Sequence, residues 1–257
     1  MTYEQKITSE LEFWKFKTLQ KPSFLDKTTN KVQKKINSLI PDKVHSAITT
    51  AIKQMVKAVL FGSAFTTSKP VLDLTLMHRE ALIKQKIENY KKTGAAEGGI
   101  TGAGGFLMSL ADFPLLLSIK MKMLFDIAAT YGYDVKDYRE RLYILHIFQL
   151  AFSSKEESKN VYLKMLDWDD KAHKLPTNID EFDWLTFQQQ YRDYIDLAKL
   201  AQMLPFIGAA VGAVANYKLI EKLGKTAMMS YRMRHFSLQY AITSVQAVET
   251  HQIKAKN

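Results

Sequence analysis

Apolar side chains recur every three to four residues along almost the whole chain, which is the period of an amphipathic α-helix. Near the N-terminus, Tyr3, Ile7, Leu11 and Trp14 form one such stripe. No segment sustains the alternation of apolar and polar residues that a half-buried strand needs. The pattern therefore predicts an all-α chain of about nine helices.

Prolines, glycines and short polar residues mark where these helices should begin and end. We expect Pro22 to end the first helix, Gly94 to end a long helix over 69–92, and Gly132 to cap an apolar helix that ends at Tyr131. The other expected segments are helices at 32–40, from Asp42 to about 60, from Asp134 to Phe152, from Ser153 or Ser154 onward, at 184–202 and from about 208 past Tyr231, with a polar loop at 167–183.

Two runs of small residues are the most unusual feature of the pattern. Gly98 and Gly102 are four positions apart, as are Gly208 and Gly212, and this spacing lets two helix backbones approach closely. Residues 98–119 carry no charge except Asp112, and residues 200–217 carry none. These runs fit a buried central helix pair, a hairpin inserted into one leaflet, or a membrane span, and the presence of Asp112 and Pro114 disfavours the last.

The formal net charge is +10, and it is unevenly distributed. Segments 1–97 and 203–257 carry +8 and +5, whereas 98–152 is neutral and 153–202 carries −3. Lysines share single helix faces at helical spacing: Lys27, Lys31, Lys34 and Lys35 in the first basic segment, and Lys218, Lys222 and Lys225 in the second. We expect either solvated helix faces or attraction to an anionic membrane surface or lipid.

This pattern argues against nucleic acid as a partner, because the aromatic residues follow the apolar stripes and do not alternate with the lysines. The chain has no cysteine, and no two of its six histidines are three or four positions apart. Carboxylates cluster at 167–170 near His173, which suits an acidic loop more often than a metal site. We therefore expect no catalytic residue, no bound metal and no cofactor.

Asp112 has three readings, because an acid in so apolar a run must be paired, capping or neutral. It can cap a helix that begins near Phe113 and Pro114. It can instead contact Asn216 across the helix pair, or act as a catalytic or proton-relay group. The enzyme alternative is a hydrolase-like activity on a lipid or peptide that uses Asp112 and Asn216.

Together, the two small-residue runs resemble the two signatures of the EcsC family. The first comprises Gly98, Gly99, Gly102, Gly104, Gly105, Asp112 and Pro114, and the second comprises Pro205, Gly208, Gly212, Asn216, Tyr231 and Arg232. The resemblance covers residues 60–236 of a single expected domain, 1–257. Residues 1–60 form a more divergent basic segment of helices, and 237–257 form a C-terminal helix or tail.

This bacterial family is named after a gene that lies beside the genes of an ABC transporter, and the resemblance transfers no catalytic residue. It implies a helical protein that is cytoplasmic or membrane-associated. The first 17 residues mix charges and lack the apolar core of a signal peptide. We therefore expect a non-enzymatic protein at the cytoplasmic face of the membrane that binds anionic lipid or a transporter subunit. A soluble protein–protein interaction module is a further alternative, and the oligomeric state is left open.

Overall fold

The computed structural model describes residues 1–20, 42–61, 69–103, 113–154, 157–183, 185, 187 and 209–254, with the backbone alone at 42–45, 98–103, 209–212 and 238–254. Within these ranges the chain forms eight α-helices, one short 3₁₀ helix at Ile179–Glu181 and no strand, which confirms the all-α fold class. The α-helices are α1 (Tyr3–Leu19), α3 (Asp42–Phe61), α4 (Leu76–Ala103), α6 (Phe113–Tyr131), α7 (Tyr138–Phe152), α8 (Ser158–Met165), α9 (Trp168–Ala172) and α12 (Ala209–Lys254).

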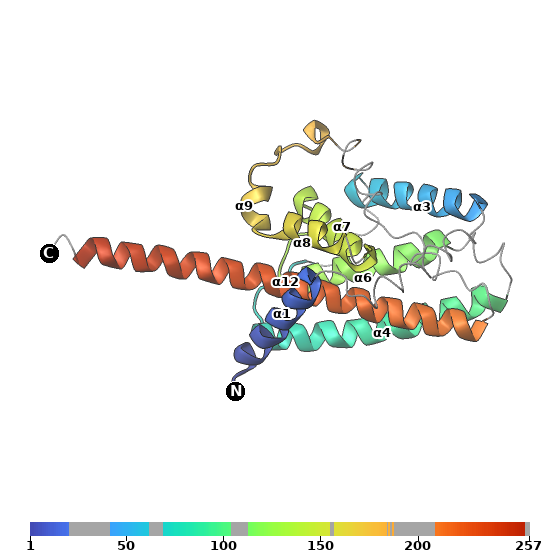
Figure 1. Cartoon of the computed structure of the whole chain (residues 1–257), viewed down its shortest axis with the longest axis horizontal. Coiled ribbons are helices and arrows are strands. Elements are labelled where there is room, and N and C mark those ends of the chain that lie inside the picture. The colour runs from blue at the N-terminus through green and yellow to red at the C-terminus, as the bar shows by residue number, and fades with distance from the viewer. Residues whose placement is uncertain are drawn as a thin grey trace.

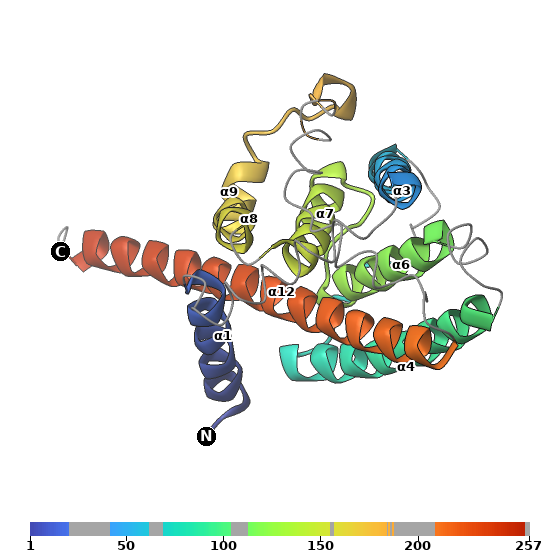
Figure 2. The same cartoon turned by 45° about the vertical axis from the view of Figure 1, so that its right-hand side comes forward.

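Helix α12 runs the length of the molecule, and α1, α4, α6 and α7 pack against it (Figures 1 and 2). Its partner along most of that length is α4, which is antiparallel: Ile220 lies on Gly94, and Gly224 lies on Ile87. Beyond the other helices, the C-terminal part of α12 projects away from the body (Figure 1). The long helix thus serves as the support on which the other elements are placed.

The hydrophobic core lies between α3, α4, α6, α7 and α12. Helices α6 and α7 supply most of its large side chains, because both are buried on nearly all sides. Phe125, Phe148, Phe152 and Tyr143 are among the largest side chains that are fully enclosed. A helix that is apolar all round is suited to this central position.

Helix α4 differs from the sequence-based expectation at both ends. It begins at Leu76, because Thr75 accepts a hydrogen bond from the His78 N–H (3.4 Å), while Val71 is tied to the carbonyl of Ala129 (2.9 Å). It does not end at Gly94 but continues to Ala103. Residues 98–103 are therefore the last residues of α4 and not the start of the apolar helix α6. Gly94 allows close contact with Ile220 and is not a helix stop.

Other boundaries were partly right. The expected ends at Tyr131 and Phe152 are confirmed, and Gly132 adopts the left-handed conformation (φ 99°) that glycine favours. The cap of α7 is Asp137 and not Asp134, because the Asp137 carboxylate accepts from the Arg139 N–H (2.9 Å). Helix α8 starts at Ser158, later than expected, and the segment 167–183 includes α9 and the 3₁₀ turn. The helix expected at 32–40 lies outside the described ranges, as does the helix expected at 184–202 except for residues 185 and 187.

Gly224 should tolerate alanine worse than Gly94 does. A Cβ atom at Gly224 would lie 2.7, 2.8 and 3.0 Å from three atoms of Ile87, so the whole branched side chain would have to move. At Gly94 the collision is with the terminal Cδ1 of Ile220 alone. We expect G224A to lower the free energy of unfolding by about 1–2 kcal/mol, and G94A by less, in urea titrations. Equal effects, or no rescue of G224A by I87V, would contradict this contact.

Candidate functional site

Two arginines of α12 carry the main polar site. Arg232 and Arg234 are two positions apart, and about 100° per residue places their side chains on opposite sides of the helix. Both are almost completely buried. A buried guanidinium needs hydrogen-bonded carboxylate partners, and here these come from four other elements.

Arg232 faces α4 and α1. Its guanidinium donates two parallel hydrogen bonds to the carboxylate of Glu80 (2.7 and 2.6 Å), which is fully buried, and a third to Glu10 (2.7 Å). The hydroxyls of Tyr3 (2.6 Å) and Tyr131 (3.1 Å) also donate to Glu80. Helix α1 is therefore held to α4 and α12 by polar contacts as well as by its apolar stripe.

The Arg232 cluster keeps Glu80 ionised. Burial by itself would raise the pKa of Glu80, but the hydrogen bonds from Arg232 and the two tyrosine hydroxyls outweigh burial, and the pKa is lowered. Burial and the Glu80 carboxylate together raise the pKa of Tyr3 and of Tyr131. All the hydroxyl donors thus remain protonated while the carboxylate accepts their bonds.

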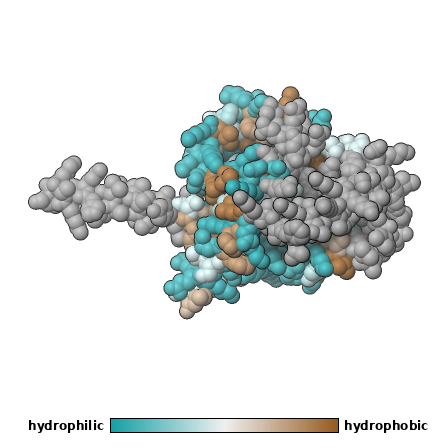
Figure 3. All heavy atoms as spheres, viewed as in Figure 1, coloured by the Kyte–Doolittle hydropathy of each residue, from teal (hydrophilic) through white to brown (hydrophobic). Residues whose placement is uncertain are grey.

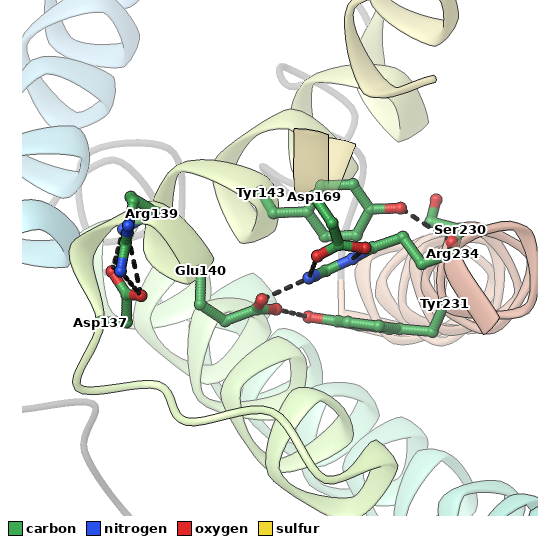
Figure 4. A network of polar contacts seen from close by, with 8 residues as sticks. All are labelled: Asp137, Arg139, Glu140, Tyr143, Asp169, Ser230, Tyr231 and Arg234. Atoms are coloured by element: carbon green, nitrogen blue, oxygen red, sulfur yellow. Dashed lines mark hydrogen bonds and ion pairs between the residues drawn. The ribbon is translucent and has the colours of Figure 1, made fainter. Parts of the chain in front are cut away.

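Arg234 faces α7 and α9, as Figure 4 shows. Its guanidinium donates to Glu140 (2.6 Å) on one side and to Asp169 on the other, and Tyr231 donates to the second oxygen of Glu140 (2.6 Å). The guanidinium also lies over the rings of Tyr133 and Tyr143, 3.9 and 4.5 Å from their centroids. This arginine joins α12, α7 and α9 at a single point.

Burial raises the pKa of Glu140, and the charge of Arg234 and the hydrogen bonds that Arg234 and Tyr231 donate oppose that rise. Burial also raises the pKa of Tyr231 and Tyr143 well above the usual value, so both rings stay protonated. The Tyr143 hydroxyl donates to the carbonyl of Ser230 (2.8 Å) and makes no bond to Glu140 (Figure 4). The Arg234 network holds positions firmly and presents no free nucleophile.

A pocket of about 360 Å³ opens beside Arg234, between α1, the α8–α9 segment and α12. Asp167, in the left-handed conformation (φ 48°), makes the turn that directs α9 back towards α12. We call this hollow the α9 pocket; it is lined by Lys15, Met165, Asp167, Trp168, Asp169, Asp170, Met233, Arg234, Phe236 and Ser237.

A second buried polar contact joins α6 to α12. Lys120 is fully buried, and its ammonium donates to the side-chain oxygen of Asn216 (2.9 Å) and to the carbonyl of Leu116 (3.4 Å). Burial lowers the pKa of Lys120 to about 7, because both acceptors are neutral. The sequence had suggested Asp112 as the partner of Asn216; Asp112 lies outside the described residues, and Lys120 was not anticipated.

The remaining family-signature residues and lysines named from the sequence are partly buried, partly exposed and partly outside the described ranges. Tyr231 and Arg232 are buried and belong to the polar clusters, whereas Pro114 is exposed in the first turn of α6. Lys218, Lys222 and Lys225 are exposed along α12. Gly98, Gly99 and Gly102 belong to the end of α4, and Gly212 to the first turn of α12. Residues outside the described ranges are Lys27, Lys31, Lys34, Lys35, Gly104, Gly105, Asp112, Pro205 and Gly208.

The described residues offer neither a metal-binding group nor a membrane-spanning helix. In the part of the chain that the structure describes, no three histidine or acidic side chains group to hold a metal ion. Across the same ranges, no helix is long and apolar enough to cross a bilayer. In the acidic run at 167–170, Asp169 is engaged by Arg234.

The sequence reasoning missed Glu80, Glu140, Arg234 and Lys120 as a polar framework. One signal was available: Lys120 stands alone in an otherwise apolar helix stripe, where a charge demands a partner. For Glu80 and Glu140 no signal existed, because acidic residues in helices with many charges are usually exposed.

Comparison with known proteins shows which family the chain belongs to. The model of the EcsC protein family matches residues 5–236. The chain belongs to the EcsC family. The family match begins well before residue 60, so α1, with Tyr3 at its start and Glu10 in its middle, lies largely within it.

Two relatives from Bacillus subtilis (strain 168) are similar over most of their length. Protein EcsC is 46% identical over 235 residues, which cover 91% of this chain and 97% of the relative. The uncharacterized protein YdbA is 28% identical over 241 residues, which cover 90% and 88%. No solved structure matches. These matches identify the family but do not indicate an activity for this chain.

The Glu80–Arg232 pair should be far more important for stability than a surface pair. Replacing Glu80 with Gln leaves a buried guanidinium without its main countercharge, so E80Q should lower the free energy of unfolding by about 3–5 kcal/mol. E12Q breaks the Glu12–Lys15 pair, whose glutamate is 62% exposed, and should cost at most about 1 kcal/mol. Urea titrations of both variants make the comparison, and equal losses would contradict it.

Lys120 should make stability depend on pH. Because its pKa falls from 10.5 to about 7 on folding, the unfolded chain binds more protons than the folded chain between these values, and stability rises with pH there. We expect the stability of wild type relative to K120M to increase by up to about 1.4 kcal/mol per pH unit in that window. Urea titrations at several pH values measure this slope.

The matched control is K84M, which removes an exposed lysine from α4. The slope assigned to Lys120 should persist in K84M and disappear in K120M. A slope that persists in K120M would show that other groups are responsible.

Proposed function

We propose that the protein binds, without catalysis, to an anionic membrane surface at the inner face of the cell membrane. One observation carries this proposal: three segments without a charged side chain lie at the same end of the molecule. They are the end of α4 (98–103), the start of α6 (113–119) and the start of α12 (209–217). We call this the uncharged end, at the right of Figure 1.

Antiparallel packing is what brings these segments together. Helices α4 and α12 pair so that residue 94 meets 220 and residue 87 meets 224, which places the end of α4 level with the start of α12. Helix α6 joins them through the Lys120–Asn216 bond. Segments separated by about a hundred positions in the sequence thus lie at the same end of the molecule.

Apolar side chains are exposed at the uncharged end. Leu115 is 49% exposed and Val214 is 55% exposed, and Tyr217, with its amphipathic ring, follows one turn later. A single exposed leucine means little, but Leu115 and Val214 both lie in segments without a charged side chain, whereas the ring of Tyr217 lies beneath the ammonium of Lys91 (4.4 Å to the centroid). Aliphatic and tyrosine side chains of this kind insert at the boundary of headgroups and acyl chains.

A basic row begins directly behind the uncharged end. Lys218, Lys222 and Lys225 follow Tyr217 at positions i, i+4 and i+7 of one exposed helix face. Each such lysine contributes about 1 kcal/mol of attraction near an anionic bilayer. Glu221 offsets part of the charge of Lys225 (3.1 Å). The order along α12 from tip to body is therefore first uncharged and then basic.

The alternatives to lipid binding are a protein-interaction module, a hydrolase and a protein that binds a transporter subunit. On the face drawn in Figure 3, hydrophobic residues form separate spots within a mostly hydrophilic described surface, so the described part of this face shows no broad apolar patch for a protein partner. The hydrolase alternative uses Asp112 and Asn216; Asp112 lies outside the described residues, so this alternative stays a prediction, and the buried Asn216 accepts a hydrogen bond from Lys120. A transporter subunit as the target is the alternative that the vesicle experiment below separates from lipid.

Sedimentation with phosphatidylglycerol-containing vesicles tests the proposal. We expect binding at low salt, weaker binding at high salt, and little binding to neutral phosphatidylcholine vesicles, because Debye screening weakens the lysine attraction. K218Q/K222Q/K225Q should reduce the partition coefficient at least about tenfold, at roughly 1 kcal/mol per lysine.

The matched control is K136Q/K159Q/K174Q, which removes the same charge from exposed lysines elsewhere. A loss of equal size in this control would mean that net charge alone acts. Absence of binding to anionic vesicles at any salt concentration would overturn the lipid proposal and leave a protein target such as a transporter subunit.

A further inference from the structure

The α9 pocket is a second site, separate from the uncharged end. It is built around Trp168 and Phe236, whereas the uncharged end of α12 stops at residue 217. Nineteen positions of helix separate residues 217 and 236, about 28 Å at 1.5 Å per residue. A ligand in this pocket would therefore not occupy the proposed lipid-binding surface.

The inner wall of the pocket is apolar and rigidly placed. Met165 and Met233 are buried, and Trp168 is only 6% exposed. The indole of Trp168 packs against the rings of Tyr143 (5.3 Å between centroids) and His146 (5.5 Å). Phe236 adds a half-buried ring from α12. A hollow of about 360 Å³ with such a wall falls in the size range of small-molecule sites.

The positive charges of the pocket are already matched. Arg234 is held between Glu140 and Asp169, and Lys15 donates to Glu12 (2.7 Å). Arg234 is therefore not available to bind an anionic ligand, and the charge of Lys15 is partly offset by Glu12. A phosphate or carboxylate would have to displace a carboxylate that is already in hydrogen-bonded contact.

The negative charges of the pocket are in excess. Asp167 and Asp170 are exposed at its rim, and within the described residues neither carboxylate takes part in a hydrogen bond or an ion pair. Among the charged lining residues, three carboxylates thus stand against Lys15 and Arg234. A net negative, aromatic-walled hollow is notable in a chain whose formal net charge is +10.

We propose that the α9 pocket binds a small organic cation, an aliphatic amine with one or two ammonium groups. The carbon chain lies against the half-buried ring of Phe236, over the buried layer that Met165, Met233 and Trp168 form. An ammonium group reaches Asp167 and Asp170 at the rim. Charge complementarity selects this class over neutral or anionic molecules of the same size.

Tryptophan fluorescence of the full chain, titrated at low salt with cadaverine, tests the site. Pentanediol is the uncharged counterpart with the same carbon chain. We expect a saturable change with cadaverine, no comparable change with pentanediol, and loss of the signal in W168F. D167N/D170N should raise Kd about fivefold, since exposed carboxylates each contribute a modest attraction.

The matched control is D73N/D180N, which removes the same charge from exposed aspartates elsewhere and should leave Kd unchanged. Thermal unfolding of each variant confirms that it is folded. Equal responses to cadaverine and pentanediol, an unchanged Kd in D167N/D170N, or an equal rise in D73N/D180N would overturn the proposal. Vesicle binding by the uncharged end stands or falls separately.

Discussion

Burial of Arg232 and Arg234 is the constraint on which the arrangement of the other helices depends. A guanidinium removed from water is tolerated only where carboxylates meet it in good geometry. Because the two arginines point to opposite sides of α12, one recruits α1 and α4 through Glu10 and Glu80, and the other recruits α7 and α9. Hydrophobic burial draws these helices together, and the two arginines fix how they are oriented.

The same constraint makes the two ends of the molecule different in charge. At the end where α12 leaves the body, charges and tyrosines are dense, and the α9 pocket forms beside Arg234. At the other end, the terminal segments of α4, α6 and α12 carry no charged side chain, and the buried Lys120–Asn216 bond joins α6 to α12 just behind them. The proposed membrane-binding surface would lie at that end, with the lysines of α12 behind it.

Much of the fold could be read from periodicity, because each helix must bury an apolar stripe. The stripe of Tyr3, Ile7 and Leu11 does face the interior, although Tyr3 also reaches Glu80 with its hydroxyl. Gly132 was recognisable as a helix end, because a φ of 99° suits glycine alone among common residues. The prediction that Gly94 ends a helix was wrong. Glycine at this position allows Ile220 of α12 to pack closely, and the sequence around Gly94 gives no sign of that neighbouring helix.

The sequence by itself determined the all-α class, the two small-residue runs, the division of charge and the family. Each of these follows from residue type and spacing along one chain. Only the tertiary structure decided that Glu80 and Glu140 are buried, that Asn216 meets Lys120, and that the α9 pocket is net negative. Those properties join residues far apart in sequence, and pairing across such distances is set by how helices pack, which no local pattern encodes.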